Sequence, residues 1–415
     1  MPPVTPGTLR CPFCGTPIVV QESPVTRWSG DTLQWGVLGC ECCAYPVIDG
    51  IPVILAGDEA REAMHAMETG HADDALRVCL GLDAERWQAF DRLRPSATAT
   101  YREMLDVLSP DAEGTYFLYR FSDPTFVMAE ALLRAIAQDP GAFDGPVLDV
   151  CGGSGHLTRV LAGLARGPVY LADVFFWKLW LARTFVVPSA HTVCCDANQP
   201  LPFARESFAA VMLSDAFPYI WQRRMLAGEL MRAVRPDGVV VMPHLHSALG
   251  YNHAQGMALS PSAYADLLAP MAPRLFSDAA LQEAAIAGSV GGATLDLTAS
   301  LTPGQLGDEN SLSLVASHRA DVCAARTLVP PAEPSGVLRL NPLYRVERRD
   351  GLSVCALTFP TEEYEDEFGS VRRYLPDTWT TPVDVTGPVD PTAFGAELPS
   401  LRQRRILVDT PPRYC

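Results

Sequence analysis

The sequence contains no apolar run near the roughly 20 residues that a membrane helix needs, and its start, MPPVTPGTLR, has no apolar signal-peptide core. We therefore predict neither a membrane span nor secretion, and we expect a cytoplasmic protein. Reducing conditions in the cytoplasm keep thiols free, so clustered cysteines favour a metal site over disulfides.

The sequence also lacks a long basic run and any internal repeat. Acidic residues outnumber basic ones by 48 to 32, and the net charge is −16. Nucleic acid would be repelled unless the basic side chains were gathered on one face, and the densest basic stretch, RRMLAGELMRAVR, has the pattern of one exposed helix face. The charge therefore favours a small molecule or a protein over nucleic acid as the partner.

Cysteines are plentiful near the beginning of the chain, where CPFC and CECC hold five of the twelve. Cys11 and Cys14 have the spacing of a zinc knuckle, and four thiolates suit a structural zinc that has no open position for a substrate. We predict as zinc ligands Cys11, Cys14, Cys40 and Cys43. Cys42 is the alternative to Cys43, and burial without a metal is the alternative for one or two of the five.

The segment AYPVIDGIPVIL follows these cysteines, and its Asp49-Gly50 pair predicts a turn between two short extended runs. Together with the cysteines, this segment resembles the small zinc-ribbon proteins that activate or accompany methyltransferases. The resemblance covers residues 9–55 and implies a zinc-ribbon-like domain at residues 1–57.

Residues 147–156 read VLDVCGGSGH, the pattern of a strand, a tight turn and a helix. Small residues let the backbone approach a ligand, and the start of a helix offers unpaired N–H groups. Taken alone, such a loop would serve a nucleotide cofactor or be only a tight turn. Further strands are predicted up to residue 245 with helices between them, and those at 169–173 and 191–197 end in an acid. This alternation predicts a parallel sheet with ligands at the carboxyl ends of its strands.

The series resembles the small-molecule branch of the class I S-adenosylmethionine-dependent methyltransferases along residues 145–245. The resemblance implies a Rossmann-like α/β core of seven strands and S-adenosylmethionine as the cofactor. It implies these cofactor-binding residues: Asp149, Cys151, Gly153, Gly155, Asp173, Asp196, Ala197 and Ser214. Asp149 corresponds to the acid under the methionine moiety and Asp173 to the ribose-binding acid, whereas Cys151 stands where glycine is commonest. An NAD-binding fold is the alternative, but GGSGHL lacks the third glycine that such a loop needs.

The segment before the predicted core is expected to help form the cofactor site. Residues 58–144 have helical patterns and are predicted to form a lid, in which Ser122 or Asp123 caps a helix that begins with Pro124. Three side chains would line this lid or pack as in any helix: Tyr116, Tyr119 and Arg120.

Three histidines, His244, His246 and His253, follow the fifth strand, and Asp215 and Tyr219 follow the fourth. A histidine can remove a proton from an acceptor because its ordinary pKa lies near 6.5. We predict catalytic roles for His244, His246 and Tyr219, with structural hydrogen bonds as the alternative. Alternation along the strand would place His246 on the same side as His244.

The remaining chain is divided between the core and an accessory region. The core is predicted to span 145–319, with its last two strands at 293–301 and 311–318. The accessory region, 320–415, is predicted to contain a hairpin around Asp350-Gly351 and a solvated acidic patch, TEEYEDEFG.

We therefore expect an enzyme that transfers a methyl group from S-adenosylmethionine to a small, natural-product-like acceptor. Two alternatives stay open at this point. One is a methyltransferase acting on RNA or protein, and the other is a non-catalytic, cofactor-binding activator of another enzyme. Besides the small acceptor, we keep a homodimer among the expected assemblies, and no membrane partner is expected.

Overall fold

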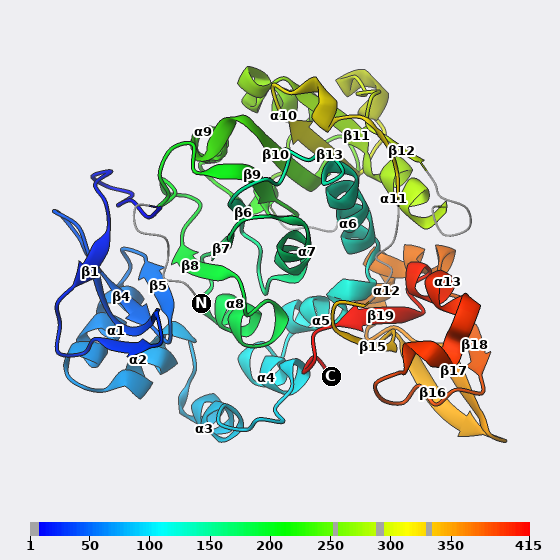
Figure 1. The fold of residues 1–415 in the computed structure, drawn as a ribbon, viewed down its shortest axis with the longest axis horizontal. Coiled ribbons are helices and arrows are strands. Elements are labelled where there is room, and N and C mark those ends of the chain that lie inside the picture. Colours follow the sequence, from blue (N-terminus) through cyan, green and yellow to red (C-terminus); the bar gives the residue numbers. More distant parts are fainter. Residues whose placement is uncertain (1–7, 252–255, 288–293, 329–333) are drawn as a thin grey trace.

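The structure of the protein is a computed structural model that describes residues 8–251, 256–287, 294–328 and 334–415 (Figure 1). Its centre is a twelve-stranded sheet of order β1-β3-β4-β5-β8-β7-β6-β9-β10-β13-β11, with β2 paired to β3. The strands are β1 (Val19–Gln21), β2 (Arg27–Ser29), β3 (Thr32–Gly39), β4 (Ala44–Ile48), β5 (Ile51–Ile54), β6 (Val147–Val150), β7 (Val169–Asp173), β8 (His191–Cys195), β9 (Phe208–Leu213), β10 (Val234–His246), β11 (Pro273–Ser277) and β13 (Ser311–Ala316).

Seven of these strands, from β8 to β11 in the sheet order, form the predicted α/β core. Strands β8, β7, β6, β9 and β10 are parallel, while β13 runs antiparallel to β10 and β11 antiparallel to β13. The sheet has a hydrophobic core on each face. Successive residues of a strand point to opposite faces, so Val147 packs into one core and Leu148 into the other. Because both faces are covered, the strands are almost wholly apolar, and the predicted fold class is confirmed.

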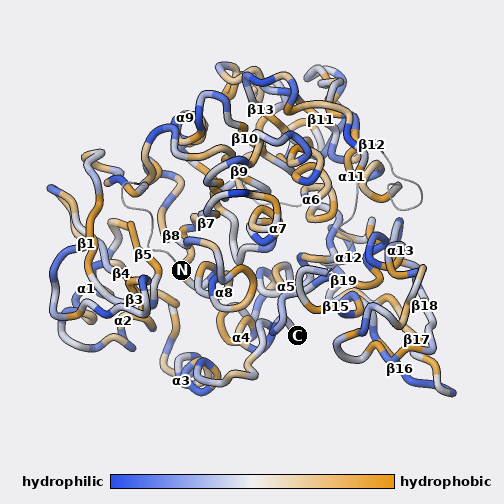
Figure 2. Tube along the Cα trace, viewed as in Figure 1, coloured by the Kyte–Doolittle hydropathy of each residue, from blue (hydrophilic) through white to orange (hydrophobic). Residues whose placement is uncertain are grey.

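Helices cover the two faces of the core. The helices are α6 (Pro124–Ile136), α7 (His156–Leu164), α8 (Phe176–Leu181), α9 (Arg223–Ala233), α10 (Pro261–Leu267) and α11 (Asp278–Ala287). Helix α6 is hydrophobic along most of its length (Figure 2), and ten of its thirteen residues are buried. Asp123 caps it as predicted, because its carboxylate accepts the N–H of Phe126 at 2.7 Å.

The N-terminal strands are part of the same sheet as the core. Strand β5 pairs in parallel with β8, where Val53 faces Cys194. The predicted Asp49-Gly50 turn joins β4 to β5, and it is held by the core because the indole N–H of Trp180 donates to the Asp49 carboxylate at 2.9 Å. The predicted boundary at residue 57 therefore does not separate two sheets, and the division into domains stays a prediction.

The prediction that residues 293–301 supply one of the last two core strands is wrong. Strand β12 (Thr294–Asp296) pairs with β14 (Ala325–Thr327) in a separate two-stranded sheet, and β11 takes the edge position instead. The physical reason is that β12 buries only its central residue, Leu295, whereas three of the five residues of β11 are buried. The second predicted strand is present as β13.

Helices before the core and a mixed region after it lie beside the sheet (Figure 1). The helices are α1 (Asp58–Glu68), α2 (Ala72–Cys79), α3 (Ala84–Leu93), α4 (Tyr101–Leu108) and α5 (Ala112–Tyr119). The C-terminal elements are β15 (Val337–Leu340), β16 (Tyr344–Arg349), β17 (Leu352–Leu357), α12 (Glu362–Phe368), β18 (Thr378–Thr381), α13 (Leu398–Gln403) and β19 (Leu407–Thr410). In the described ranges, no helix is both long enough and apolar enough to cross a bilayer.

Two expectations for the C-terminal region have different outcomes. The predicted hairpin is confirmed, since β16 and β17 pair on either side of Asp350-Gly351. The acidic segment is not merely solvated, because it forms helix α12. Its Tyr364 and Phe368, four residues apart, are buried on one face of the helix.

We expect Ile51→Ala to destabilise the whole protein by about 2–5 kcal/mol, because Ile51 is fully buried in the core shared by β5 and the central helices. Urea denaturation followed by circular dichroism would measure this change, and one cooperative transition is expected. Val20→Ala is the control, since Val20 is 44% exposed and its loss should change stability by less than about 0.5 kcal/mol. A separate early transition of the N-terminal strands would contradict the prediction.

Candidate active site

The glycine loop joins the end of β6 to the start of α7. The N–H of Gly153 donates to the Asp173 carboxylate at 3.0 Å, which ties the loop to the end of the neighbouring strand β7. A Cβ atom on Gly153 would lie 2.7 Å from the ring of Phe117. Helix α5, which carries Phe117, therefore lies against the loop, in the region for which the sequence predicts a lid.

The lid is held from the far end of the chain. The hydroxyl of Tyr414 donates to the carbonyl of Phe117 at 2.9 Å and contacts His156 Nε2 at 2.8 Å. The ring of Tyr414 also stacks on Tyr101, with centroids 4.7 Å apart. These contacts fix the carbonyl of Phe117 over the first turn of α7, and none of them follows from local sequence.

Cys151 occupies a strained position in the loop. Its φ of +58° is left-handed, a conformation that costs a non-glycine residue roughly 1–2 kcal/mol. A small side chain does fit here, as the sequence suggested, but the backbone conformation explains why glycine suits this position better.

We expect Cys151→Gly to be about 1 kcal/mol more stable than Cys151→Ala, because both remove the sulfur but only alanine retains the strain. This order is the reverse of the usual one at ordinary backbone angles. Urea denaturation of the two variants would measure the difference. An alanine variant as stable as the glycine variant would contradict the assigned strain.

Two buried polar atoms near the loop have no hydrogen-bond partner within the described ranges: Oδ1 of Asp149 and Oγ of Ser214. The other carboxylate oxygen of Asp149 accepts from Thr158 at 2.6 Å, and burial raises the pKa of Asp149 to about 7. Ser214 follows Leu213, which pairs with Val150, so both atoms belong to adjacent strands. Unpaired buried polar atoms are costly, and these two suit a polar ligand at the loop.

The remaining predicted cofactor residues lie at the ends of β7 and β8. Asp173 is buried and also accepts the N–H of Phe175 at 2.9 Å, and burial raises its pKa. Asp196 accepts the N–H of Asn198 at 2.8 Å, and Ala197 is buried. The structure therefore places the predicted cofactor residues along one edge of the sheet.

That edge also carries an apolar rim. Of the twelve large hydrophobic side chains exposed in the described ranges, seven follow β7, β9 and β10: Val174, Phe175, Tyr219, Trp221, Leu249, Tyr251 and Met257. The carboxyl ends of parallel strands are where α/β sheets bind ligands, so exposed apolar groups there suit a ligand site. Tyr219, 53% exposed, is on this rim.

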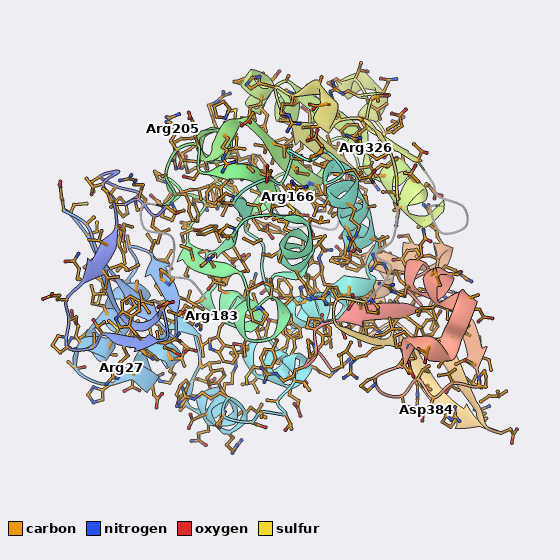
Figure 3. The ribbon with its side chains drawn as sticks, in the orientation of Figure 1. Arg27, Arg166, Arg183, Arg205, Arg326 and Asp384 are labelled. Atoms are coloured by element: carbon orange, nitrogen blue, oxygen red, sulfur yellow. The ribbon has the colours of Figure 1, made fainter. Side chains whose placement is uncertain are left out.

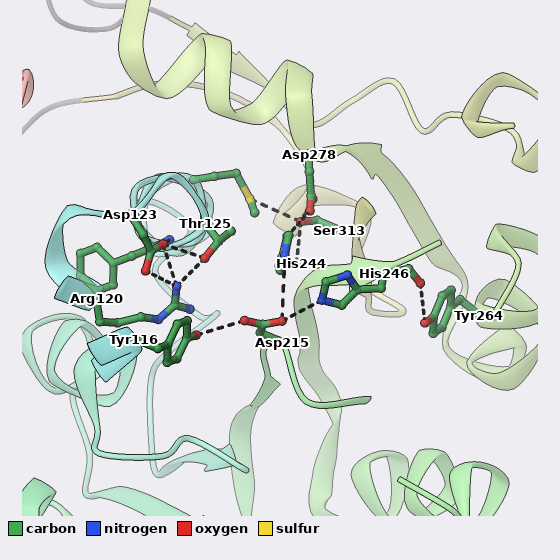
Figure 4. Close-up of polar contacts among 12 residues, drawn as sticks. Tyr116, Arg120, Asp123, Thr125, Asp215, His244, His246, Tyr264, Asp278 and Ser313 are labelled. Carbon is green, nitrogen blue, oxygen red and sulfur yellow. Dashed lines mark hydrogen bonds and ion pairs between the residues drawn. The ribbon is translucent and has the colours of Figure 1, made fainter. Parts of the chain in front are cut away.

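Asp215, just after β9, meets His244 and His246, which lie in the last residues of β10 rather than after this strand as expected (Figure 4). His246 Nε2 lies 3.1 Å from Asp215 Oδ1, and His244 Nε2 lies 3.9 Å from the same oxygen. The two histidines are thus on the same side, as predicted. His253, the third histidine of the prediction, is outside the described residues.

Each member of this trio is held by another side chain or by the backbone (Figure 4). The Tyr116 hydroxyl donates to Asp215 Oδ2 at 3.0 Å, and His244 Nδ1 contacts Asp278 Oδ2 at 2.9 Å. The backbone carbonyl of His246 accepts from Tyr264 at 2.8 Å. These partners come from separate parts of the chain. The sequence suggested only Tyr116, as a lid residue, and did not link Asp278 or Tyr264 to the site.

Charge and backbone strain are both concentrated here. Burial would lower the pKa of His244, but the carboxylates of Asp215 and Asp278 outweigh it and raise that pKa to about 9. Asp215 and His244 have φ values of +54° and +57°, a left-handed conformation that costs about 1–3 kcal/mol at each and is typical of functional sites. A register shift in β10 before Leu245 accompanies the strain at His244.

A cavity of about 450 Å³ opens beside the two histidines. Five acids line it: Asp278, Asp308, Glu309, Asp366 and Glu367. No lysine or arginine is among the lining residues that the structure describes. Asp366 and Glu367 belong to α12, so the C-terminal region supplies one wall.

The cysteine cluster fits a tetrahedral metal. The sulfur of Cys42 lies 3.7 Å from those of Cys11 and Cys40, and Cys14 lies 3.7 Å from Cys40. Zinc–sulfur bonds of about 2.3 Å require sulfurs about 3.8 Å apart. The geometry gathers Cys42 rather than the predicted Cys43 into the group. The Cys43 sulfur lies 3.4 Å from that of Cys42, and the Cys43 N–H donates to the Cys40 sulfur at 3.3 Å.

We expect about one zinc per chain, retained in Cys43→Ser but lost from Cys42→Ser after mild chelation, because only Cys42 belongs to the geometric group. Metal analysis of the desalted proteins would measure it. Equal loss in both variants, or retention in both, would contradict the assignment of the fourth ligand.

Comparison with known proteins agrees with this arrangement. Residues 147–238 match the methyltransferase domain family. The chain contains a methyltransferase domain. The match begins at β6 and ends within β10, so it covers the glycine loop, the predicted cofactor residues and Asp215. The prediction of an S-adenosylmethionine-dependent methyltransferase is confirmed. No curated protein matches the chain.

Several solved structures are similar to the chain around this domain. A SAM-dependent methyltransferase from Aquifex aeolicus is 13% identical over 48% of this chain and 96% of its own, with a TM-score of 0.32. The YcgJ protein from Bacillus subtilis is 13% identical over 46% and 98%, with a TM-score of 0.33. A chain from the complex of the Haloferax volcanii Trm112 methyltransferase activator with a methyltransferase is 15% identical over 50% and 99%, with a TM-score of 0.35.

Proposed function

We propose that this methyltransferase acts on a small acceptor that binds in the acidic cavity beside His244 and His246. The observation that carries the proposal is the position of that cavity. Tyr116, which holds Asp215, is the neighbour of Phe117, which covers the glycine loop. His246, which lines the cavity, contacts Asp215, so a chain of contacts links the cavity to the lid over the cofactor loop.

The size and charge of the cavity indicate the class of acceptor. A volume of about 450 Å³ is within the range of roughly 300–1,000 Å³ that is usual for small-molecule sites. Five acidic side chains, with no lysine or arginine in the described lining, would repel an anion. We therefore propose an acceptor that is neutral or positively charged, such as an amine or an uncharged hydroxyl compound.

The residues that would hold S-adenosylmethionine are the glycine loop with Asp149, Asp173, Asp196, Ala197 and Ser214. When bound, this cofactor supplies an electrophilic methyl group that carries its own activation. The protein then mainly positions the acceptor, and positioning can supply up to roughly 7–11 kcal/mol of the barrier.

The contacts of His244 favour positioning over proton abstraction. A general base needs a nitrogen that is free to take up a proton, whereas His244 Nδ1 contacts Asp278 Oδ2 at 2.9 Å and Nε2 lies 3.9 Å from Asp215 Oδ1. We propose that His244 and His246 orient the acceptor. Tyr219, on the rim, would contact it from outside.

RNA is the less favoured acceptor. The net charge of the chain is −16, and the cavity is lined by acids. Phosphate groups would meet repulsion there. The non-catalytic alternative is also less favoured, because a cofactor-binding activator would not need a second cavity of about 450 Å³ beside His244 and His246.

We propose that the zinc ribbon has a structural role, as in the activator-like family that it resembles, since β5 extends the sheet of the core. A cytoplasmic location and a homodimer remain predictions.

Transfer of tritium from labelled S-adenosylmethionine to separate pools of amines, hydroxyl compounds, proteins and RNA tests the proposal of a small acceptor. Labelling confined to protein or RNA would contradict it.

Asp173→Ala should weaken S-adenosylmethionine binding by about 2–4 kcal/mol, because charge-assisted hydrogen bonds to ribose are lost and the Gly153 tie is broken. Isothermal titration calorimetry would measure the affinity. Asp384→Ala is the matched control, since Asp384 is exposed in the C-terminal region far from the loop (Figure 3). Unchanged affinity in Asp173→Ala would remove Asp173 from the cofactor site.

A further inference from the structure

We propose that Asp215, His244 and His246 bind one divalent transition-metal ion beside the acidic cavity, which the two histidines line. One ligand atom from each residue lies within 4.8 Å of the others. The two histidines and one carboxylate form the set that binds divalent first-row metals with open positions for a further ligand.

The distances are close to those of a metal site. Imidazole and carboxylate ligands at about 2.0–2.2 Å from an ion lie about 3–3.5 Å from one another. The Asp215–His246 separation is 3.1 Å and the Asp215–His244 separation is 3.9 Å. Small side-chain rotations would therefore bring the three atoms around one ion.

The surroundings orient each ligand as metal sites require. His244 can donate its Nδ1 proton to Asp278, which leaves Nε2 directed toward Asp215. Asp278 is itself fixed by the hydroxyl of Ser313, which donates to Oδ1 at 2.6 Å. A carboxylate behind a histidine fixes its tautomer and increases its basicity as a ligand.

The backbone gives an independent observation. Asp215 and His244 are both left-handed, and the N–H of Asp215 donates to the carbonyl of Pro243. Neither residue would adopt this strained conformation by default, and together they direct two ligands toward one point. The five acids of the cavity wall add negative charge that favours a cation.

The ion would leave coordination positions facing the cavity. If the proposed function holds, an oxygen or nitrogen of the acceptor would take such a position, and the metal would lower its pKa and fix its orientation. This role rests on the proposed function, but the site itself does not. Metal binding and methyl transfer are therefore tested separately.

The experiment titrates Mn²⁺ alone into the full chain and measures free Mn²⁺ by its electron paramagnetic resonance signal. Mn²⁺ prefers oxygen and nitrogen ligands to thiolates, so the cysteine cluster should not compete. We expect one saturable site per chain. Asp215→Asn and His246→Gln should each weaken it at least 10-fold, and Asp278→Asn should weaken it about 10–100-fold through His244.

Asp308→Asn is the matched control, since it removes one negative charge from the same cavity wall without touching the trio. It should weaken Mn²⁺ binding less than 3-fold.

Both test variants should fold. Asparagine tolerates the left-handed conformation of Asp215, and His246→Gln changes a residue that has no left-handed backbone. Absence of saturable binding would overturn the proposal. Equal weakening by Asp308→Asn and Asp215→Asn would also overturn it, because binding would then depend only on overall charge.

Discussion

The in-register pairing of parallel strands β7, β6 and β9 is the constraint on which the rest of the site depends. Val150 pairs with Ala172 on one side and with Leu213 on the other. The residues that follow these three positions, Cys151, Asp173 and Ser214, must therefore leave the sheet at the same edge. A shift of register would separate the glycine loop from its acid and from the candidate metal ligands.

Strain is found where that edge meets the ligands. Cys151, Asp215 and His244 are all left-handed, and each follows or interrupts a buried strand. Such conformations persist only where the surrounding structure holds them. The hydrogen bonds from Tyr116 to Asp215 and between His244 and Asp278 supply part of that support. The free energy of the strained backbone is therefore offset by contacts with the surrounding structure.

Segments far from the core in sequence complete the site from two sides. The N-terminal strands extend the sheet beyond β8, and Tyr414 holds the lid through the carbonyl of Phe117. Helix α12 closes the cavity with Asp366 and Glu367. These additions surround the methyltransferase domain at residues 147–238.

The sequence by itself determined the core strands up to β10, the glycine loop, the acids Asp149 and Asp173, and the cysteine cluster, because these depend on local patterns of burial and turn residues. Only the tertiary structure decided that β11 rather than β12 completes the sheet and that Cys42 rather than Cys43 joins the cluster. It also joined Asp215, His244 and His246 to partners as distant as Tyr116 and Asp278. Such contacts depend on the packing of segments far apart in the chain, and no local pattern encodes them.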